Sequence, residues 1–183
     1  MRVGYFYADN ILTPEECDLI IREGSKELHP ALVGTEDGGK LPDPEIRKGQ
    51  AAFFCSGENP EIDELMLRCV QAMSECSMQA YGVPIMQVEP IQFTDYLAGD
   101  HYRWHYDQHG IGVEGKPERF VSASIELSDP DSYEGGGLEF FGISDAVPDR
   151  KRGRIIVFSS MMCHRARIIE SGRRCSLVLW GRP

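Results

Sequence analysis

Residues 101–110 carry three histidines and one aspartate, in the order HYRWHYDQHG. In an extended strand, positions two apart project from the same face, so the side chains of His105 and Asp107 would point the same way. An imidazole nitrogen and a carboxylate oxygen are common metal ligands, and two of them at one strand end can share an ion. The pair alone is weak evidence, because a third ligand must come from elsewhere in the chain.

His164 is the strongest candidate for that third ligand. It follows the apolar run RIIVFSSMMC, which predicts a strand running beside the strand of His105 in a rolled sheet. The other histidines, His29, His101 and His109, are interpreted as solvated or supporting imidazoles.

Two histidines and one carboxylate leave coordination positions open, which favours a catalytic metal over a structural one. Non-haem Fe(II) enzymes that activate oxygen use this ligand set, and so do catalytic zinc enzymes, whose bound water attacks the substrate. A zinc hydrolase also needs a general base, and no residue between His105 and His164 is identifiable as one. The ligands themselves do not decide between the two metals.

Arg174, ten residues after His164, points to an anionic ligand. It opens an apolar strand in which one face carries Arg174, Ser176, Val178 and Trp180. A guanidinium on an interior face is costly without a partner. A dicarboxylate with a 2-oxo acid end could chelate the metal and place its far carboxylate in the Arg174 fork, with Ser176 as a second candidate contact.

The stretch from Tyr96 to Pro183, nearly half of the chain, resembles the 2-oxoglutarate- and Fe(II)-dependent dioxygenases, specifically their prolyl 4-hydroxylase-like branch. The matching pieces, in the family's order and spacing, are YLAGDHYRWHYD, LSDPDSYEGGGLEF, RGRIIVFSSMMCHRA and SGRRCSLVLW. The N-terminal pieces ILTPEECDLII and IRKGQAAFF resemble the family's supporting region more loosely.

This resemblance implies a double-stranded β-helix, or jelly-roll, core flanked by helices. It implies that His105, Asp107 and His164 bind Fe(II). It further implies that Arg174 holds the far carboxylate of 2-oxoglutarate and that the Tyr96 hydroxyl bonds to the same co-substrate. The implied enzyme uses O2 and 2-oxoglutarate to hydroxylate a C–H bond and releases succinate and CO2, with ascorbate as a further reductant.

A prolyl residue of a peptide or protein is the substrate that the resemblance favours, although related sequences act on other side chains and on small molecules. The acidic chain would suit a basic partner, such as a translation-associated protein. Nucleic-acid demethylation is a less favoured subtype. A zinc-dependent hydrolase and a jelly-roll protein that binds metal and a small acid without turnover are the alternatives from other classes.

The composition is that of one domain with a hydrophobic core, since 42% of the 183 residues are hydrophobic. Six cysteines without a C-x-x-C motif indicate reduced thiols rather than a disulfide framework. No apolar run is long enough to span a bilayer, and MRVGYFYADN does not resemble a secretion signal, so we expect a cytoplasmic protein.

Charge is unevenly distributed along the chain. The net charge of −10 argues against nucleic-acid binding over the whole surface. From Arg150 to Pro183, however, nine Lys or Arg residues stand against one acid, Glu170. These basic residues either pair with acidic neighbours or bind an anionic small molecule.

Two helices are predicted before residue 85. Thr13-Pro14-Glu15-Glu16 has the pattern of a capping box, and apolar or small residues recur at helical spacing from Cys17 to Leu28. A second helix starts at Asn59-Pro60 and runs to about Tyr81. Between them, residues 29–50 are rich in Gly, Pro and charge, which predicts a long exposed loop, and residues 29–58 form a candidate lid.

After Gly82, short β-branched and aromatic runs predict antiparallel strands in MQVEPIQFTDYL, RFVSASIELS, GLEFF, RIIVFSS and CSLVLW. Apolar and polar residues alternate with period two across residues 121–128. Gly135-Gly136-Gly137 predicts a turn rather than a phosphate loop. We therefore expect one α+β, mainly β domain over residues 1–183, with helical support and the candidate lid in 1–85 and a jelly-roll catalytic core in 86–183.

Overall fold

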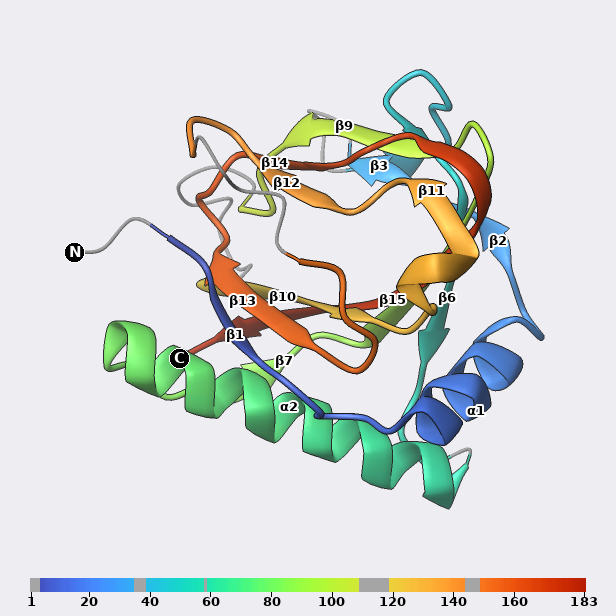
Figure 1. Ribbon diagram of the computed structural model, residues 1–183. Coiled ribbons are helices and arrows are strands. Elements are labelled where there is room, and N and C mark those ends of the chain that lie inside the picture. The colour runs from blue at the N-terminus through green and yellow to red at the C-terminus, as the bar shows by residue number, and fades with distance from the viewer. Residues whose placement is uncertain (1–3, 35–38, 58, 109–118, 144–148) are drawn as a thin grey trace.

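Two antiparallel sheets face each other, with both helices on the outer side of the larger one (Figure 1). The computed structural model describes residues 4–34, 39–57, 59–108, 119–143 and 149–183. Within these residues the arrangement is mainly β with two α-helices, which is the class expected from the sequence.

The large sheet has nine strands and its main path runs β1-β13-β10-β15-β8-β6-β2, with β7 and β11 also paired to β15. Its strands are β1 (Phe6–Ala8), β2 (His29–Pro30), β6 (Gln50–Phe54), β7 (Gln87–Val88), β8 (Ile91–Leu97), β10 (Val121–Glu126), β11 (Tyr133–Gly135), β13 (Ile155–Ser159) and β15 (Ile169–Arg182). The long strand β15 pairs with both β10 and β8, so it joins the two halves of the sheet.

The small sheet runs in the order β12-β14-β9-β5. Its strands are β5 (Arg47–Lys48), β9 (His101–His105), β12 (Leu138–Phe140) and β14 (His164–Ala166). A separate ribbon pairs β3 (Val33–Gly34) with β4 (Lys40–Leu41), and a 3-10 turn covers Pro130–Ser132.

Helix α1 (Pro14–Gly24) begins as predicted, because Thr13 and Glu16 form a reciprocal capping box. It ends before Leu28, the last apolar residue in the predicted helical pattern. The Ser25 hydroxyl and backbone N–H both donate to the Ile21 carbonyl, which closes the last turn. Gly24 lies so close to the Phe93 ring that an added Cβ would be 2.5 Å from it, so the helix packs tightly on the sheet here.

Helix α2 (Pro60–Tyr81) matches its predicted bounds. The Asn59 side chain accepts from the N–H groups of Glu61 and Ile62, and Gly82 ends the helix in a left-handed conformation. Among the described helices, none combines the length and apolar character needed to cross a membrane.

The main hydrophobic core lies between the helices and the outer face of the large sheet. The predicted alternation in β10 is confirmed, since Val121, Ala123 and Ile125 are fully buried in this core together with α2. Ser122, Ser124 and Glu126 therefore lie on the opposite face of the strand, which faces the small sheet. One face of β10 builds the core and the other lines the interior between the sheets.

The described residues of segment 29–50, which exclude 35–38, form short strands where a long exposed loop was predicted. They include β2, β3, β4 and β5, and β5 pairs with β9 while β2 pairs with β6. The composition did not reveal these strands because each has only two residues, too few to show a periodicity.

Two smaller predictions are confirmed in the described chain. All six cysteines are free thiols. Gly135, Gly136 and Gly137 have φ angles of 70°, 61° and 87°, which carry the chain from β11 into β12. An added Cβ on Gly135 would meet the Ile168 carbonyl oxygen at 2.5 Å, so these glycines have an architectural reason.

Candidate metal centre and adjoining pocket

His105, Asp107 and His164 come together at one end of the small sheet. Strands β9 and β14 are antiparallel neighbours, and His164 is the Cα partner of His105. One ligand atom from each of the three residues lies within 4.8 Å of the others. The Nε2 atoms of His105 and His164 are 3.6 and 3.5 Å from the two carboxylate oxygens of Asp107.

The route to this arrangement differs from the predicted one. The strand preceding His164, β13, lies in the large sheet between β1 and β10, so the prediction that it runs beside β9 is wrong. The chain crosses to the small sheet after Ser159, and β14 then pairs with β9. Asp107 lies beyond the end of β9, where its backbone N–H donates to the Ser160 carbonyl in the crossing segment.

Backbone carbonyls set the orientation of both imidazoles. His105 Nδ1 is 2.8 Å from the Arg103 carbonyl oxygen, and His164 Nδ1 is 2.9 Å from that of Met162. A carbonyl can only accept, so each Nδ1 carries a hydrogen, and the Nε2 of each ring is turned toward Asp107. The Nε2 atom of each ring is thereby oriented to bind a cation.

The local electrostatics favour a neutral His164 beside an ionised Asp107. Burial lowers the pKa of His164 to about 4. Burial opposes ionisation of Asp107, but His105 and His164 outweigh it and hold the pKa of Asp107 below its ordinary value. Asp107 Oδ2 is buried and has no hydrogen-bond partner. Two imidazole nitrogens and a carboxylate that converge in this way suit a divalent cation.

Of the other histidines, two lie outside this cluster. His29 is exposed on β2, and His101 pairs with Lys48 of β5, with its Nε2 3.5 Å from the Glu45 carbonyl oxygen. These positions agree with the prediction that His29 and His101 are solvated or supporting imidazoles and not metal ligands. His109 lies outside the described residues.

A buried arginine that the sequence did not single out stands next to the centre. The Tyr102 ring stacks on His105 with centroids 3.6 Å apart, and the Arg47 guanidinium lies 4.7 Å from the Tyr102 centroid. Arg47 Nη1 donates to the Leu32 carbonyl, whereas its Nε is buried without a partner. Arg47 lies in a stretch of sequence rich in Gly, Pro and charged residues, which suggested that it would be exposed. The only sequence signal that it belongs near the site was the loose resemblance of IRKGQAAFF to the family's supporting region.

The side chains of Tyr102 and Trp104 have different neighbours. The strand pattern alone did not predict which way either one points. Tyr102 lies against His105, as described. Trp104 lies among the exposed side chains, edge-on to Phe141 and 4.5 Å from the Arg165 guanidinium carbon. Tyr102 therefore belongs to the centre and Trp104 to the outer face of the small sheet.

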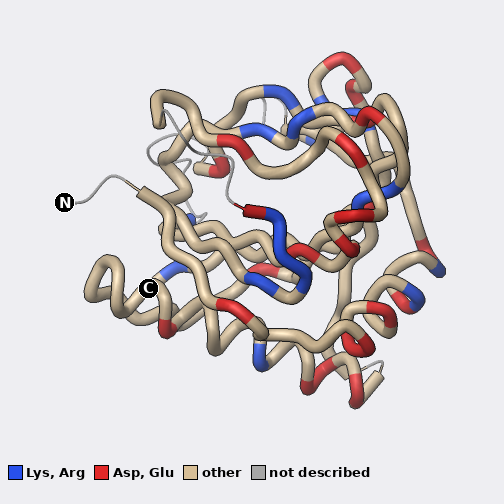
Figure 2. Tube along the Cα trace, in the orientation of Figure 1, with Lys and Arg blue, Asp and Glu red and all other residues tan. Residues whose placement is uncertain are grey.

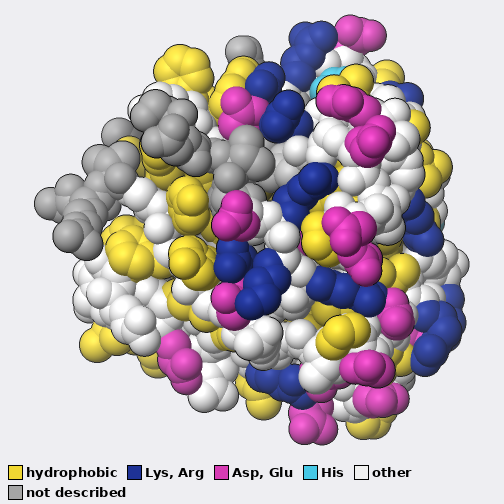
Figure 3. Space-filling model, viewed as in Figure 1, with side chains coloured by type: hydrophobic (Ala, Val, Ile, Leu, Met, Phe, Trp, Pro, Cys, Tyr) yellow, Lys and Arg dark blue, Asp and Glu magenta, His cyan; other side chains and the backbone are white. Residues whose placement is uncertain are grey.

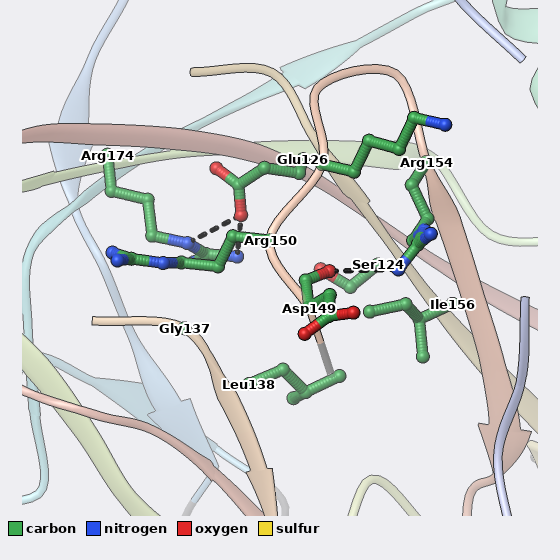
Figure 4. A pocket seen from close by; sticks show the side chains of 10 residues that line it. Ser124, Glu126, Gly137, Leu138, Asp149, Arg150, Arg154, Ile156 and Arg174 are labelled. Atoms are coloured by element: carbon green, nitrogen blue, oxygen red, sulfur yellow. Dashed lines mark hydrogen bonds and ion pairs between the residues drawn. The ribbon is translucent and has the colours of Figure 1, made fainter. Parts of the chain in front are cut away.

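Arg174 is buried, as predicted, but its partner is a protein carboxylate. Its Nε and Nη2 are each 2.9 Å from Oε2 of Glu126 on the neighbouring strand β10 (Figure 4). Burial works against both charges: it raises the pKa of Glu126 although Arg174 opposes this, whereas Glu126 outweighs burial at Arg174 and raises the pKa of the guanidinium. The alternation in β10 placed Glu126 opposite the core residues, and that was the signal that could have identified it.

Tyr96 and Ser176 also lie in the large sheet beside this pair. Tyr96 is the Cα partner of Arg174 and is buried. Gly49 approaches the Tyr96 ring so closely that an added Cβ would lie 2.4 Å from it. The Ser176 hydroxyl is 2.7 Å from the Thr94 hydroxyl, so it already has a partner.

Buried polar atoms without a hydrogen-bond partner gather around the space between the sheets. In the described chain these atoms are Arg47 Nε, Gln92 Nε2, Asp107 Oδ2, Glu126 Oε1, Tyr133 Oη and Trp180 Nε1. Buried polar groups are normally satisfied, so a concentration of unsatisfied ones indicates a site for polar ligands. The residues present therefore fit a metal ion with a small polar co-substrate.

The C-terminal basic residues are mostly neutralised by acids. Ion pairs join Lys151 and Arg154 to Asp9, Arg152 to Asp18, Arg165 and Arg167 to Glu139, Arg173 to Asp95 and Arg174 to Glu126. Figure 2 shows a run of basic positions in the segment that leads into β13 and acidic positions distributed along the rest of the trace, and Figure 3 shows the two signs intermixed on one face. Pairing with acidic neighbours accounts for most of this basic region.

Residues 91–182 match the family model of the 2OG-Fe(II) oxygenase superfamily. A PKHD-type hydroxylase of Methylobacterium nodulans is 33% identical over 126 residues, which are 66% of this chain and 53% of that protein. A PKHD-type hydroxylase of Synechococcus elongatus is 32% identical over 137 residues, covering 74% of this chain and 60% of that protein. The chain thus matches little more than half the length of these curated relatives.

Solved structures of prolyl hydroxylases share the fold. The viral collagen prolyl hydroxylase of Paramecium Bursaria Chlorella virus-1 has a TM-score of 0.72 and 21% identity, over 97% of this chain and 95% of the other. A Pseudomonas putida prolyl-4-hydroxylase has a TM-score of 0.73 and 22% identity, over 98% and 92%. A Trichoplax adhaerens prolyl hydroxylase, solved with a hypoxia inducible factor peptide, has a TM-score of 0.70 and 18% identity, over 97% and 83%. The expected jelly-roll core flanked by helices is confirmed.

Proposed function

Because the chain belongs to the 2OG-Fe(II) oxygenase superfamily, we propose that it uses Fe(II), 2-oxoglutarate and O2 to hydroxylate a C–H bond, releasing succinate and CO2. In this proposal His105, Asp107 and His164 are the iron ligands. The observation that carries it is the convergence of two imidazole lone pairs on a buried carboxylate with an unpartnered oxygen.

The bound metal and its co-substrate would supply the oxidising chemistry, and the protein would supply position and shielding. The carbonyls of Arg103 and Met162 hold the two imidazoles in the tautomer that leaves Nε2 free to bind. Asp107 contributes the negative charge, since its pKa lies below the ordinary range. Three ligands gathered at one end of the small sheet would leave the other side of the ion open.

Other buried residues are proposed to bind the co-substrate. Arg174 would hold the far carboxylate of 2-oxoglutarate, and Tyr96 and Ser176 would contact the same molecule from the inner face of the sheet. Arg47 adds a second buried positive charge beside Tyr102. The burial of Arg174, Tyr96, Ser176 and Arg47 and the unpartnered Nε of Arg47 support this assignment.

For the substrate we propose a prolyl residue in a peptide or protein. Support comes from the names of the relatives, which are PKHD-type hydroxylases, and from the peptide bound to the Trichoplax adhaerens enzyme. Tyr106 and Met161, close in sequence to Asp107 and His164, are exposed and offer apolar contacts. The net charge of −10 favours a basic partner.

Three further proposals complete this view. Ascorbate serves as an auxiliary reductant, and the protein acts in the cytoplasm as a single domain over residues 1–183. Residues 29–58 act as a lid, which is supported by Arg47 reaching from this segment to Tyr102 beside the centre. Limited proteolysis tests the lid, because metal, a 2-oxoglutarate analogue and a prolyl peptide together should protect this segment.

The decisive experiment measures succinate from 2-oxoglutarate when O2 is admitted to anaerobically iron-loaded protein. We expect succinate in the wild type and none in His164→Ala, with a large rise in the 2-oxoglutarate requirement of Arg174→Ala. His101→Ala is the matched control, since that imidazole lies outside the cluster, and it should retain turnover. Absence of succinate together with zinc-dependent hydrolysis would refute the oxygenase proposal.

A further inference from the structure

The pair formed by Glu126 and Arg174 places a protein carboxylate on the guanidinium proposed to bind the co-substrate. Both side chains are nearly inaccessible, with exposed fractions of 8% and 5%. They face the pocket shown in Figure 4, which also exposes Ser124, Arg150 and Ile156 at its wall. A dicarboxylate reaching Arg174 would therefore meet a guanidinium that is already neutralised.

The contact between the two residues is one-sided. Arg174 donates twice, through Nε and Nη2, to the same oxygen Oε2 of Glu126. The other oxygen, Oε1, is buried and has no hydrogen-bond partner. In a bidentate contact the guanidinium would donate to both carboxylate oxygens. Here Arg174 bonds only one of them, so the contact is weaker than a bidentate pair.

Tyr133 and Arg150 already act on the Glu126 carboxylate, because burial raises its pKa and both of these groups, together with Arg174, lower it. The Tyr133 hydroxyl is buried without a partner, and Glu126, after burial, is a cause that raises the pKa of Tyr133 to about 12. The Arg150 guanidinium lies 4.7 Å from the Tyr133 ring centroid and donates to the backbone carbonyls of Tyr133 and Gly135. In the described chain no carboxylate forms an ion pair with Arg150, whereas Arg154 is paired with Asp9.

From this arrangement we infer that Glu126 competes with the far carboxylate of 2-oxoglutarate for Arg174, and that co-substrate binding moves Glu126 toward Tyr133 and Arg150. This inference rests on the proposed function. Glu126 thereby sets how strongly the protein binds a 2-oxo acid that carries a second carboxylate. A 2-oxo acid without that carboxylate does not displace Glu126, and its affinity does not depend on Glu126.

Equilibrium binding without turnover tests the competition. Protein loaded with Mn(II) under anaerobic conditions is titrated by calorimetry with 2-oxoglutarate and with 2-oxopentanoate, which has the same chain length but lacks the far carboxylate. We expect Glu126→Gln to bind 2-oxoglutarate about tenfold more tightly than the wild type and to bind 2-oxopentanoate about equally. Glu139→Gln, which removes the carboxylate paired with Arg165 on the small sheet, is the matched control and should change neither affinity.

A double substitution tests the second position of Glu126. Arg150→Ala should weaken 2-oxoglutarate binding several-fold when Glu126 is present and change it little in the Glu126→Gln background. Tyr133→Phe should behave in the same way. Equal effects of Arg150→Ala in both backgrounds would overturn the proposed movement.

The outcomes separate this inference from the proposed function. Unchanged or weaker 2-oxoglutarate binding by a folded Glu126→Gln protein would show that Glu126 positions Arg174 rather than competing for it. If Glu126→Gln does not fold, as judged by thermal unfolding, Glu126→Asp replaces it, and its shorter reach should also tighten 2-oxoglutarate binding; no tightening would overturn the inference. Failure of the wild type to bind 2-oxoglutarate in any metal-loaded form would instead refute the proposed function.

Discussion

Replacement of Arg174 by methionine should destabilise the fold in a strongly pH-dependent way. Methionine has a similar length and fills much of the same space, so the change removes the charge and hydrogen bonds with little loss of packing. Glu126 would then be a buried carboxyl group without its ion-pair partner, since both of its contacts at 2.9 Å come from Arg174.

The expected magnitude follows from the burial of the pair. Removing one partner of a buried ion pair costs about 3–5 kcal/mol, because the remaining charge stays out of water. Burial is the main cause that raises the pKa of Glu126, and Arg174 is the largest influence that opposes it. A raised folded-state pKa penalises the ionised form, so the penalty is absent below the unfolded pKa, near 4.5, and grows as pH rises above it. Each unit by which the folded pKa is raised adds about 1.4 kcal/mol to that penalty.

Urea unfolding at pH 5 and pH 8 measures this effect. We expect Arg174→Met to lose much more unfolding free energy at pH 8 than at pH 5, and the double variant Glu126→Leu, Arg174→Met to recover most of the loss at both values. A buried pair replaced as a whole by apolar residues is often neutral in stability. A loss of equal size at both pH values, or a double variant as unstable as the single one, would refute the reasoning.

Three further outcomes are expected. Asp9 pairs with Arg154 and Lys151, which lower its pKa to about 2, so this carboxylate stabilises the fold above pH 3.8 and loses that contribution as pH falls toward 2. Acid unfolding monitored by circular dichroism should show Asp9→Asn about 1 kcal/mol less stable than wild type at pH 7, because the pair is partly solvated, and equally stable near pH 2. Gly24→Ala should destabilise the protein by about 1–3 kcal/mol in thermal unfolding despite alanine's higher helix propensity, since its Cβ would lie 2.5 Å from the Phe93 ring, and a gain in stability would contradict this packing. Tyr96→Phe should raise the half-saturating 2-oxoglutarate concentration by about threefold to tenfold through loss of one hydrogen bond, with a maximal rate close to that of wild type in the succinate assay.

Local patterns in the sequence were sufficient for much of the architecture. Thr13 with Glu16, and Asn59 before Pro60, identify helix starts because capping depends on residues within one turn. The period-two alternation in β10 assigned Val121, Ala123 and Ile125 to the core because neighbouring strand positions must face opposite ways. The same local logic brought His105 and Asp107 to one side.

Long-range pairing was beyond those patterns. The sequence indicated His164 as the third ligand, but it assigned the wrong strand to carry it, because a crossing between sheets leaves no periodic signal. The two-residue strands of segment 29–50 were missed for a similar reason, and with them the burial of Arg47, which depends on β5 pairing with β9.

By itself, the sequence determined the candidate metal ligands and where the helices and most strands lie, since these follow from side-chain type and short-range periodicity. Only the tertiary structure decided what each buried charge faces. Glu126 and Arg174 are 48 positions apart, and they meet because β10 pairs with β15 in a register that sets both side chains on the interior face. That register depends on the packing of the whole sheet against α2, so the partner of Arg174 is a property of the fold and not of any local motif.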